Sequence, residues 1–71
     1  MASAAATVQK FNDRFPIGST VSWRSIASDK CPYRDYTVLY QATVHHGLPV
    51  AWFAEKSGMV SVEPKHVDYS K

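Results

Sequence analysis

Residues 37–54, TVLYQATVHHGLPVAWFA, decide the fold, and they contain no Asp, Glu, Lys or Arg. From Val38 to Val44 the even-numbered positions are apolar or aromatic, which predicts one buried face of a β-strand. Residues 45–49 (HHGLP) interrupt this pattern with turn-forming residue types. Residues 50–54 (VAWFA) predict a second strand that is apolar on both faces. We expect such a strand to be central, or to have its second face covered by another element such as an N-terminal helix.

The downstream sequence continues this antiparallel pattern. Residues 55–58 (EKSG) predict a tight hairpin connection, and residues 59–63 predict a return strand whose two valines face inward. Pro64 ends that strand because it has no N–H to donate. Residues 64–67 indicate one tight turn, and residues 67–69 predict a last short strand that closes the sheet.

The upstream sequence predicts a short helix over residues 3–14. Apolar side chains recur there at helical spacing, and Ser3 is a favourable N-cap. A frayed tail up to Thr7 is the alternative interpretation. Pro16 ends the helix, since it pushes the residue before it out of the α-helical region.

Residues 20–25 alternate and predict a half-buried strand, and residues 26–33 predict the longest surface loop. The whole order of elements predicts a mainly β chain: a small SH3-like antiparallel barrel of four to five strands with a short N-terminal helix. A flat antiparallel sheet with the helix across one face is the alternative. We expect one domain at residues 10–71, with residues 1–9 as an N-terminal extension or the start of the helix. Both folds place the following side chains near the core: Trp23, Tyr40, Trp52, Val60 and Val62.

Composition excludes several classes of protein. The chain has 71 residues, of which 45% are hydrophobic and 20% charged, and this is ordinary for one small globular domain. The single cysteine, Cys31, excludes an internal disulfide framework. No apolar run approaches the length of a membrane span, and residues 1–7 (MASAAAT) lack the features of a signal peptide. We therefore expect a cytoplasmic protein that does not contact a membrane.

Four short motifs resemble those of a known group of proteins: residues 11–21 (FNDRFPIGSTV), 49–53 (PVAWF), 57–63 (SGMVSVE) and 66–67 (HV). Together they resemble small uncharacterised proteins encoded by bacteriophages, prophages and other mobile elements. The resemblance implies such an origin and an SH3-like fold, and the family has no established activity to carry over. This chain departs from the pattern at residues 36–41, where the family often has a longer charged strand.

Residues 58–64 (GMVSVEP) resemble the end of the core of the plasmid-borne type II dihydrofolate reductases, which are also SH3-like. In that family a Gln-Ile-Tyr stretch lines a shared pore and binds cofactor and substrate. Ser61, Val62 and Glu63 stand in its place here, and Glu63 adds a carboxylate where an anionic cofactor would bind. We therefore expect no reductase activity.

No arrangement of residues predicts catalysis. The histidines and Cys31 show no fixed spacing that would join them in a metal site. Cys31 follows Lys30, which favours a lower thiol pKa, yet the sequence supplies neither a base nor an oxyanion site beside it. The three isolated glycines indicate turns and no phosphate-binding loop. We predict a protein that is not an enzyme and has no metal site and no cofactor.

Aromatic and arginine residues interleave at Trp23-Arg24 and at residues 33–36 (YRDY). Tyr, Trp and Arg are the usual hot-spot residues of protein interfaces, and the same mixture stacks bases and pairs with phosphates. A third interpretation is that Tyr33 and Tyr36 simply cover the open end of the barrel. We predict a binding surface made of Arg24, Lys30, Tyr33, Arg34 and Tyr36, with the turn residues His45 and His46 on a neighbouring rim.

The predicted function is a non-enzymatic binding module, encoded by a phage or mobile element, that binds a larger macromolecule through protein–protein interaction. Nucleic-acid binding is the first alternative: residues 1–36 carry five basic and three acidic groups, although the formal net charge of the chain is only +2. A structural or homo-oligomeric phage component is the second alternative, suggested by the apolar residues 50–54. The oligomeric state does not follow from the sequence.

Overall fold

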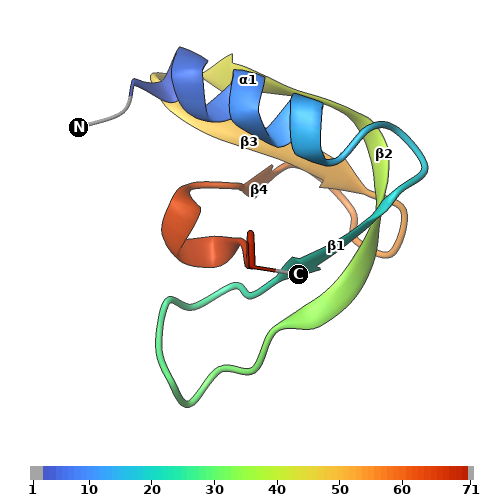
Figure 1. Cartoon of the computed structure of the whole chain (residues 1–71), viewed down its shortest axis with the longest axis vertical. Helices are drawn as coiled ribbons and strands as arrows, with labels where there is room; N and C mark the ends of the chain where they lie inside the picture. Colours follow the sequence, from blue (N-terminus) through green and yellow to red (C-terminus); the bar gives the residue numbers. More distant parts are fainter. Residues whose placement is uncertain (1–2, 71) are drawn as a thin grey trace.

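Four antiparallel strands form a sheet in the order β1-β2-β3-β4, and this sheet curls into a half-barrel with a short helix packed against it (Figure 1). The computed structural model describes residues 3–70. Its elements are α1 (Ala4–Arg14), β1 (Thr20–Trp23), β2 (Arg34–His45), β3 (Leu48–Phe53), β4 (Val60–Ser61) and the 3-10 helix η1 (Pro64–His66). The mainly β prediction is confirmed, and the flat-sheet alternative is wrong because the sheet is curled.

Helix α1 begins where the sequence predicts it. The Ser3 hydroxyl accepts the N–H of Ala6 at 3.1 Å and caps the first turn. Thr7 is buried within the helix, so the alternative of a frayed tail is wrong. At the other end, the N–H of Phe15 bonds to the carbonyl of Phe11 at 2.7 Å. Both phenylalanines are buried, and their ring centroids lie 5.2 Å apart.

Strand β2 departs from the predicted alternation at two bulges. Val38 pairs with Phe53 and Tyr40 with Trp52, so β2 advances two residues while β3 advances one. A second irregularity follows before Thr43. A bulge adds one residue to one strand and turns the next side chain to the other face. The side chain of Tyr40 is therefore 58% exposed, and the prediction that it lies in the core is wrong.

Strand β3 shows which face each of these residues occupies. Ala51 and Phe53 are fully buried and belong to the core, so the alternating side chains of Leu48, Val50 and Trp52 point to the opposite face. Trp52 is half-buried there, edge-on to its cross-strand neighbour, so the prediction that it lies in the core is also wrong.

The β2–β3 hairpin is longer than the sequence predicts. His45 pairs with Leu48, which leaves only His46 and Gly47 as the loop. Their φ angles are 51° and 77°, the two positive values that a type I′ turn requires. Residues 45, 48 and 49 therefore belong to the strands and not to the turn.

Asn12 attaches α1 to the sheet. Its side-chain Oδ1 accepts the N–H of Ala42 at 2.8 Å, and its Nδ2 donates to the carbonyl of Ala42 at 3.2 Å. Ala42 lies within the second irregularity of β2, between Tyr40 and Thr43. One amide side chain thus provides hydrogen-bond partners for both the N–H and the carbonyl of Ala42, at a position where the pairing of β2 with β3 is interrupted.

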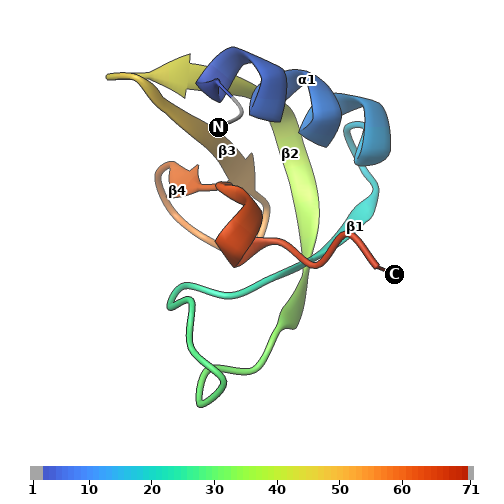
Figure 2. The same cartoon turned by 60° about the vertical axis from the view of Figure 1, so that its left-hand side comes forward.

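The C-terminal segment closes the half-barrel against β1 (Figure 2). Val67 forms an isolated bridge with Trp23, and the N–H of Asp68 donates to the carbonyl of Ser22 at 2.9 Å. The predicted last strand is thus a single bridge, and the tight turn at residues 64–67 is confirmed as η1. The indole N–H of Trp23 donates to the carbonyl of Ser61 at 2.7 Å, joining β1 to β4.

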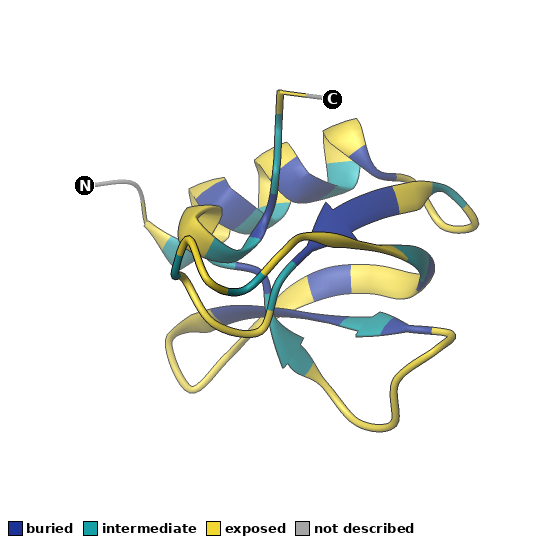
Figure 3. Cartoon of the chain, turned by 90° about the horizontal axis from the view of Figure 1, so that it is seen from below, coloured by how far each residue is buried: buried dark blue, intermediate teal, exposed yellow. Residues whose placement is uncertain are grey.

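The core lies between the concave face of the sheet and α1 (Figure 3). Trp23 and Val62 are buried in it as predicted, and Val60 is half-buried against it. Its fully buried side chains include Phe11, Val21, Val38, Phe53 and Val62. Within residues 3–70, no helix combines the length and apolar character needed to cross a membrane.

Candidate interaction surface

Arg24 holds the loop of residues 24–33 in place. Its Nε donates to the carbonyl of Lys65 in η1 at 3.2 Å, and its Nη1 donates to the carbonyl of Ser28 at 3.1 Å. The guanidinium carbon also lies 4.6 Å from the centroid of the Tyr33 ring, which is a cation–π distance. Arg24 is half-buried, and its contacts join both sides of the loop to the C-terminal turn.

Short turns give the rest of this loop its shape. The N–H of Ser28 donates to the carbonyl of Ile26, and the N–H of Cys31 donates to the carbonyl of Ser28, both at 2.9 Å. The Ser28 hydroxyl accepts the N–H of Lys30 at 3.3 Å. Ser28 therefore uses its hydroxyl and its carbonyl to organise the tip that Arg24 fixes.

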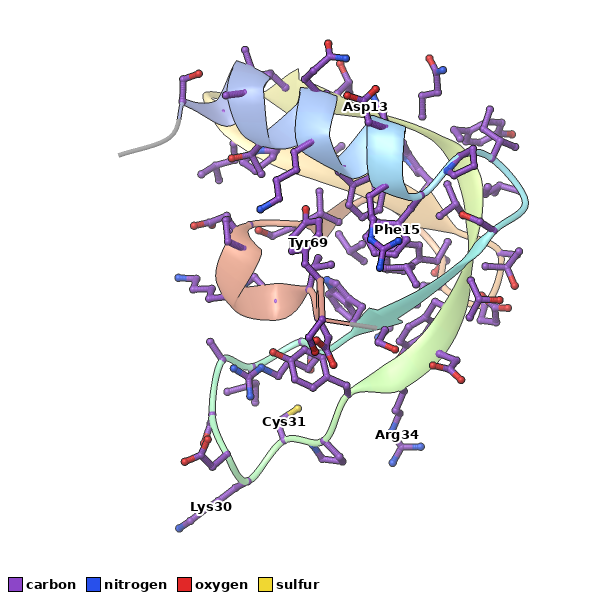
Figure 4. All side chains as sticks on the ribbon, viewed as in Figure 1. Asp13, Phe15, Lys30, Cys31, Arg34 and Tyr69 are labelled. Atoms are coloured by element: carbon purple, nitrogen blue, oxygen red, sulfur yellow. The ribbon has the colours of Figure 1, made fainter. Side chains whose placement is uncertain are left out.

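The loop and the first residue of β2 together present two cations and two apolar groups to solvent. Lys30 and Arg34 point away from the body of the molecule (Figure 4). Neither has an ion-pair partner within residues 3–70. Ile26 is 63% exposed, and Tyr33 is 36% exposed beneath Arg24. The structure thus brings four of the predicted residues together: Arg24, Lys30, Tyr33 and Arg34.

Tyr36 has a different place from the one the sequence predicts. Its ring stacks on Phe53 with centroids 5.2 Å apart and an interplanar angle of 16°, and it meets Trp23 edge-on at 5.4 Å. The ammonium of Lys56 lies 5.9 Å from its centroid. Tyr36 therefore packs against the core and supports the base of the loop.

His45 and His46 lie apart from the loop. Arg34 is the first residue of β2 and His45 the last, so the whole length of this strand lies between them (Figure 1). Both histidines are exposed, and their rings meet edge-on at 4.2 Å. The hairpin tip is consequently a second surface and does not extend the loop.

Cys31 lies inside the loop, where its sulfur points inward (Figure 4). Its thiol pKa is lowered, first by a hydrogen bond from the backbone of Ile26 and then by the hydroxyl and backbone of Ser25 and the charge of Arg24. Such donors favour the thiolate form. No histidine or carboxylate of residues 3–70 is among the groups that lower this pKa.

A groove runs between α1 and the C-terminal segment. Its lining includes Gln9, Lys10, Arg14 and Tyr69. The ammonium of Lys10 lies 4.4 Å from the Tyr69 ring centroid, and the Tyr69 hydroxyl is buried with no hydrogen-bond partner within residues 3–70. Burial raises the pKa of this phenol, which keeps it neutral. Because the hydroxyl is covered, it offers no contact to a ligand in the groove.

Sequence reasoning missed a third surface, on the convex side of the hairpin. We name it the outer hairpin face and define it by Leu39, Tyr40, Leu48, Val50 and Trp52. The rings of Tyr40 and Trp52 pack edge-on at 6.1 Å, and Val50 is buried. The only signal in the sequence was that residues 50–54 are apolar on both faces.

Comparisons of the chain with protein-family models, with curated proteins and with solved structures give no match. Among residues 3–70, no group of three His, Cys, Asp or Glu side chains is placed to hold a metal ion. The three surfaces, namely the loop, the hairpin tip and the outer hairpin face, are therefore the basis for inferring a function.

Proposed function

We propose that this chain is a non-enzymatic binding module with an SH3-like barrel, encoded by a phage or another mobile element, that binds a larger protein in the cytoplasm. The SH3-like part of the proposal is supported by the strand order, by the long loop between β1 and β2, and by the 3-10 turn before the bridge at Val67. The proposed origin is supported by the motif resemblance of residues 11–21 and 57–63.

The observation that carries the proposal is the loop fixed by Arg24. A surface loop with no internal contacts loses conformational entropy when it binds, and this loss weakens the complex. Here two hydrogen bonds and one cation–π contact order the loop in advance. The groups that it presents, Tyr33 and Arg34, are of the types that dominate protein interfaces.

The charges of the loop favour a protein over a nucleic acid. Asp29 precedes Lys30 and Asp35 follows Arg34 in the sequence, so the segment has little net positive charge. Arg24 already donates to two carbonyls, which leaves Lys30 and Arg34 as the cations without such contacts. Affinity for a nucleic acid grows with the number of phosphates contacted, and two cations contact few.

The test is quantitative affinity capture from cells that express the full chain, with loop variants beside the wild type. We expect at least one protein to be captured by the wild type and lost with Tyr33→Ala and with Arg34→Ala. Lys56→Ala is the matched control, because Lys56 is also an exposed cation but lies over Trp23, off the loop. Circular dichroism checks that each variant is folded.

Equal capture of the same proteins by the wild type and both loop variants would remove the loop as the binding surface. Capture that disappears after nuclease treatment and falls steeply with added salt would replace the proposed protein partner with a nucleic acid.

A further inference from the structure

The outer hairpin face carries large exposed apolar side chains on the side of β2 and β3 opposite the core. Tyr40 is 58% exposed, Leu48 48% and Leu39 42%. The core, α1 included, lies on the concave side of β2 and β3. Contiguous exposed apolar side chains on a small protein mark interaction sites, whereas single exposed ones are ordinary. Three of the eight large exposed apolar residues among residues 3–70 lie on this one face.

Charge restricts what can cover this face. All eight Lys and Arg and all six Asp and Glu lie outside residues 37–54. A partner surface with charged groups at its centre would bury them without an opposite charge, and this costs several kcal/mol per charge. The partner surface must therefore be apolar and uncharged as well.

One surface on this molecule meets that requirement, and it is the outer hairpin face itself. Apart from Val44 in β2, the remaining large exposed apolar residues of the described chain are scattered over loops and turns: Ile17, Ile26, Tyr33 and Met59. We propose that the outer hairpin face binds a second copy of this chain and forms a two-fold symmetric dimer. A two-fold axis places the same patch on both copies, so the Tyr40 end of one hairpin lies against the Leu48 end of the other.

The size of the face fits a weak dimer. A specific interface needs at least about 500 Å² from each partner, which is roughly a ninth of the 4554 Å² that the chain exposes. An aromatic side chain buries about 150–250 Å² in full, so the exposed part of Tyr40 alone supplies about 100 Å². The leucines, Trp52 and the flanking Thr43 and His45 bring the total to the required order. We expect a dissociation constant in the micromolar range, because an interface of minimum size is seldom tighter.

The test is sedimentation equilibrium of the intact chain from about 10 µM to about 1 mM, a range that spans weak association. We expect a reversible monomer–dimer equilibrium for the wild type. Tyr40→Lys and Leu48→Lys each bury a charge from each copy in the apolar interface without an opposite charge, so we expect each to weaken association at least about tenfold. Ile17→Lys is the matched control, because Ile17 is 60% exposed but lies in the turn after α1, and it should leave the dimer unchanged.

Two results would overturn this proposal. One is a monomer over the whole concentration range. The other is a dimer that Tyr40→Lys and Leu48→Lys leave as stable as the wild type, since a different surface would then form it. The exposed position of both side chains lets the variants fold, and circular dichroism verifies this. The loop of residues 24–33 lies outside the face, so its capture test fails or succeeds independently.

Discussion

Replacing Arg24 by methionine should loosen the loop of residues 24–33 while the barrel stays folded. Methionine keeps much of the apolar stem and removes the guanidinium. The variant loses the hydrogen bonds to the carbonyls of Lys65 and Ser28 and the contact with the Tyr33 ring. Two net hydrogen bonds contribute about 0.5–1.5 kcal/mol each, and an exposed cation–π contact contributes about 0.5–1 kcal/mol.

The sum, reduced for the partial exposure of Arg24, is about 2 kcal/mol, which corresponds to about a 30-fold larger equilibrium constant for opening of the loop. Amide hydrogen exchange measured by NMR reports this opening directly. The N–H of Cys31 is the best probe, because it bonds to the carbonyl of Ser28 inside the loop. Its exchange should accelerate about 30-fold in Arg24→Met, by the opening constant derived above.

The matched control is Arg34→Met, since Arg34 is exposed and has no ion-pair partner within residues 3–70. That variant should leave the exchange of Cys31 unchanged. The reasoning is refuted if Arg24→Met leaves the Cys31 amide as protected as in the wild type, or if amides of β2 and β3 lose protection to the same extent as the loop.

The remaining predictions concern stability and are measured by urea unfolding. Asn12→Ala should lower the free energy of unfolding by about 1–3 kcal/mol, because two backbone groups of β2 lose their partner. An unchanged urea midpoint would contradict the stabilising role of the two Asn12 hydrogen bonds. The pKa of Glu55 lies below its usual 4.5, because its carboxylate accepts the N–H and hydroxyl of Thr37. The stabilisation it gives is present above pH 4.5 and disappears as the pH falls through the lowered folded-state pKa. Glu55→Gln should thus be less stable than the wild type at neutral pH and equal to it at strongly acidic pH. A difference in the free energy of unfolding that stays the same at both pH values would contradict this prediction. Trp23→Ala should cost about 3–5 kcal/mol because the ring is buried, and the half-buried Trp52 should cost less than half as much when replaced by alanine; equal losses would mean that both rings are core.

The elements themselves could be predicted from local sequence because each depends on neighbouring residues. Ser3 marks the start of α1, and His46-Gly47 occupies the tight turn after β2. The apolar side chains at helical spacing include Phe11, which is buried in the core beside Phe15. These signals depend on propensity, capping and turn conformation, which act over a few residues.

The faces of β2 could not be predicted in the same way. Strict alternation places Tyr40 beside Val38 and Ala42 in the core, yet the bulge between Val38 and Tyr40 turns it to the convex face. Bulges depend on how β2 pairs with β3, and no local composition signals them. The outer hairpin face is defined by the register of β2 against β3, and it is therefore visible only in the structure.

The binding loop was predicted in part for a similar reason. Its exposed groups, Lys30 and Arg34, follow from a polar segment without periodicity. The role of Arg24 does not, because its contact with Lys65 joins residues 41 positions apart in the sequence. The separation of His45 from Arg34 likewise reflects the length of β2, which is longer than the strand predicted from the sequence.

Site-specific photo-crosslinking in cells tests the central claim most directly. A photoreactive phenylalanine replaces Tyr33 in the loop, and in separate experiments Ile17 as the control. The account predicts that the probe at Tyr33 forms a covalent adduct with a larger protein, that nuclease treatment leaves this adduct intact, and that the probe at Ile17 does not form it. If the probe at Tyr33 yields no adduct beyond that of Ile17, the loop of residues 24–33 is not the surface through which this chain binds a protein.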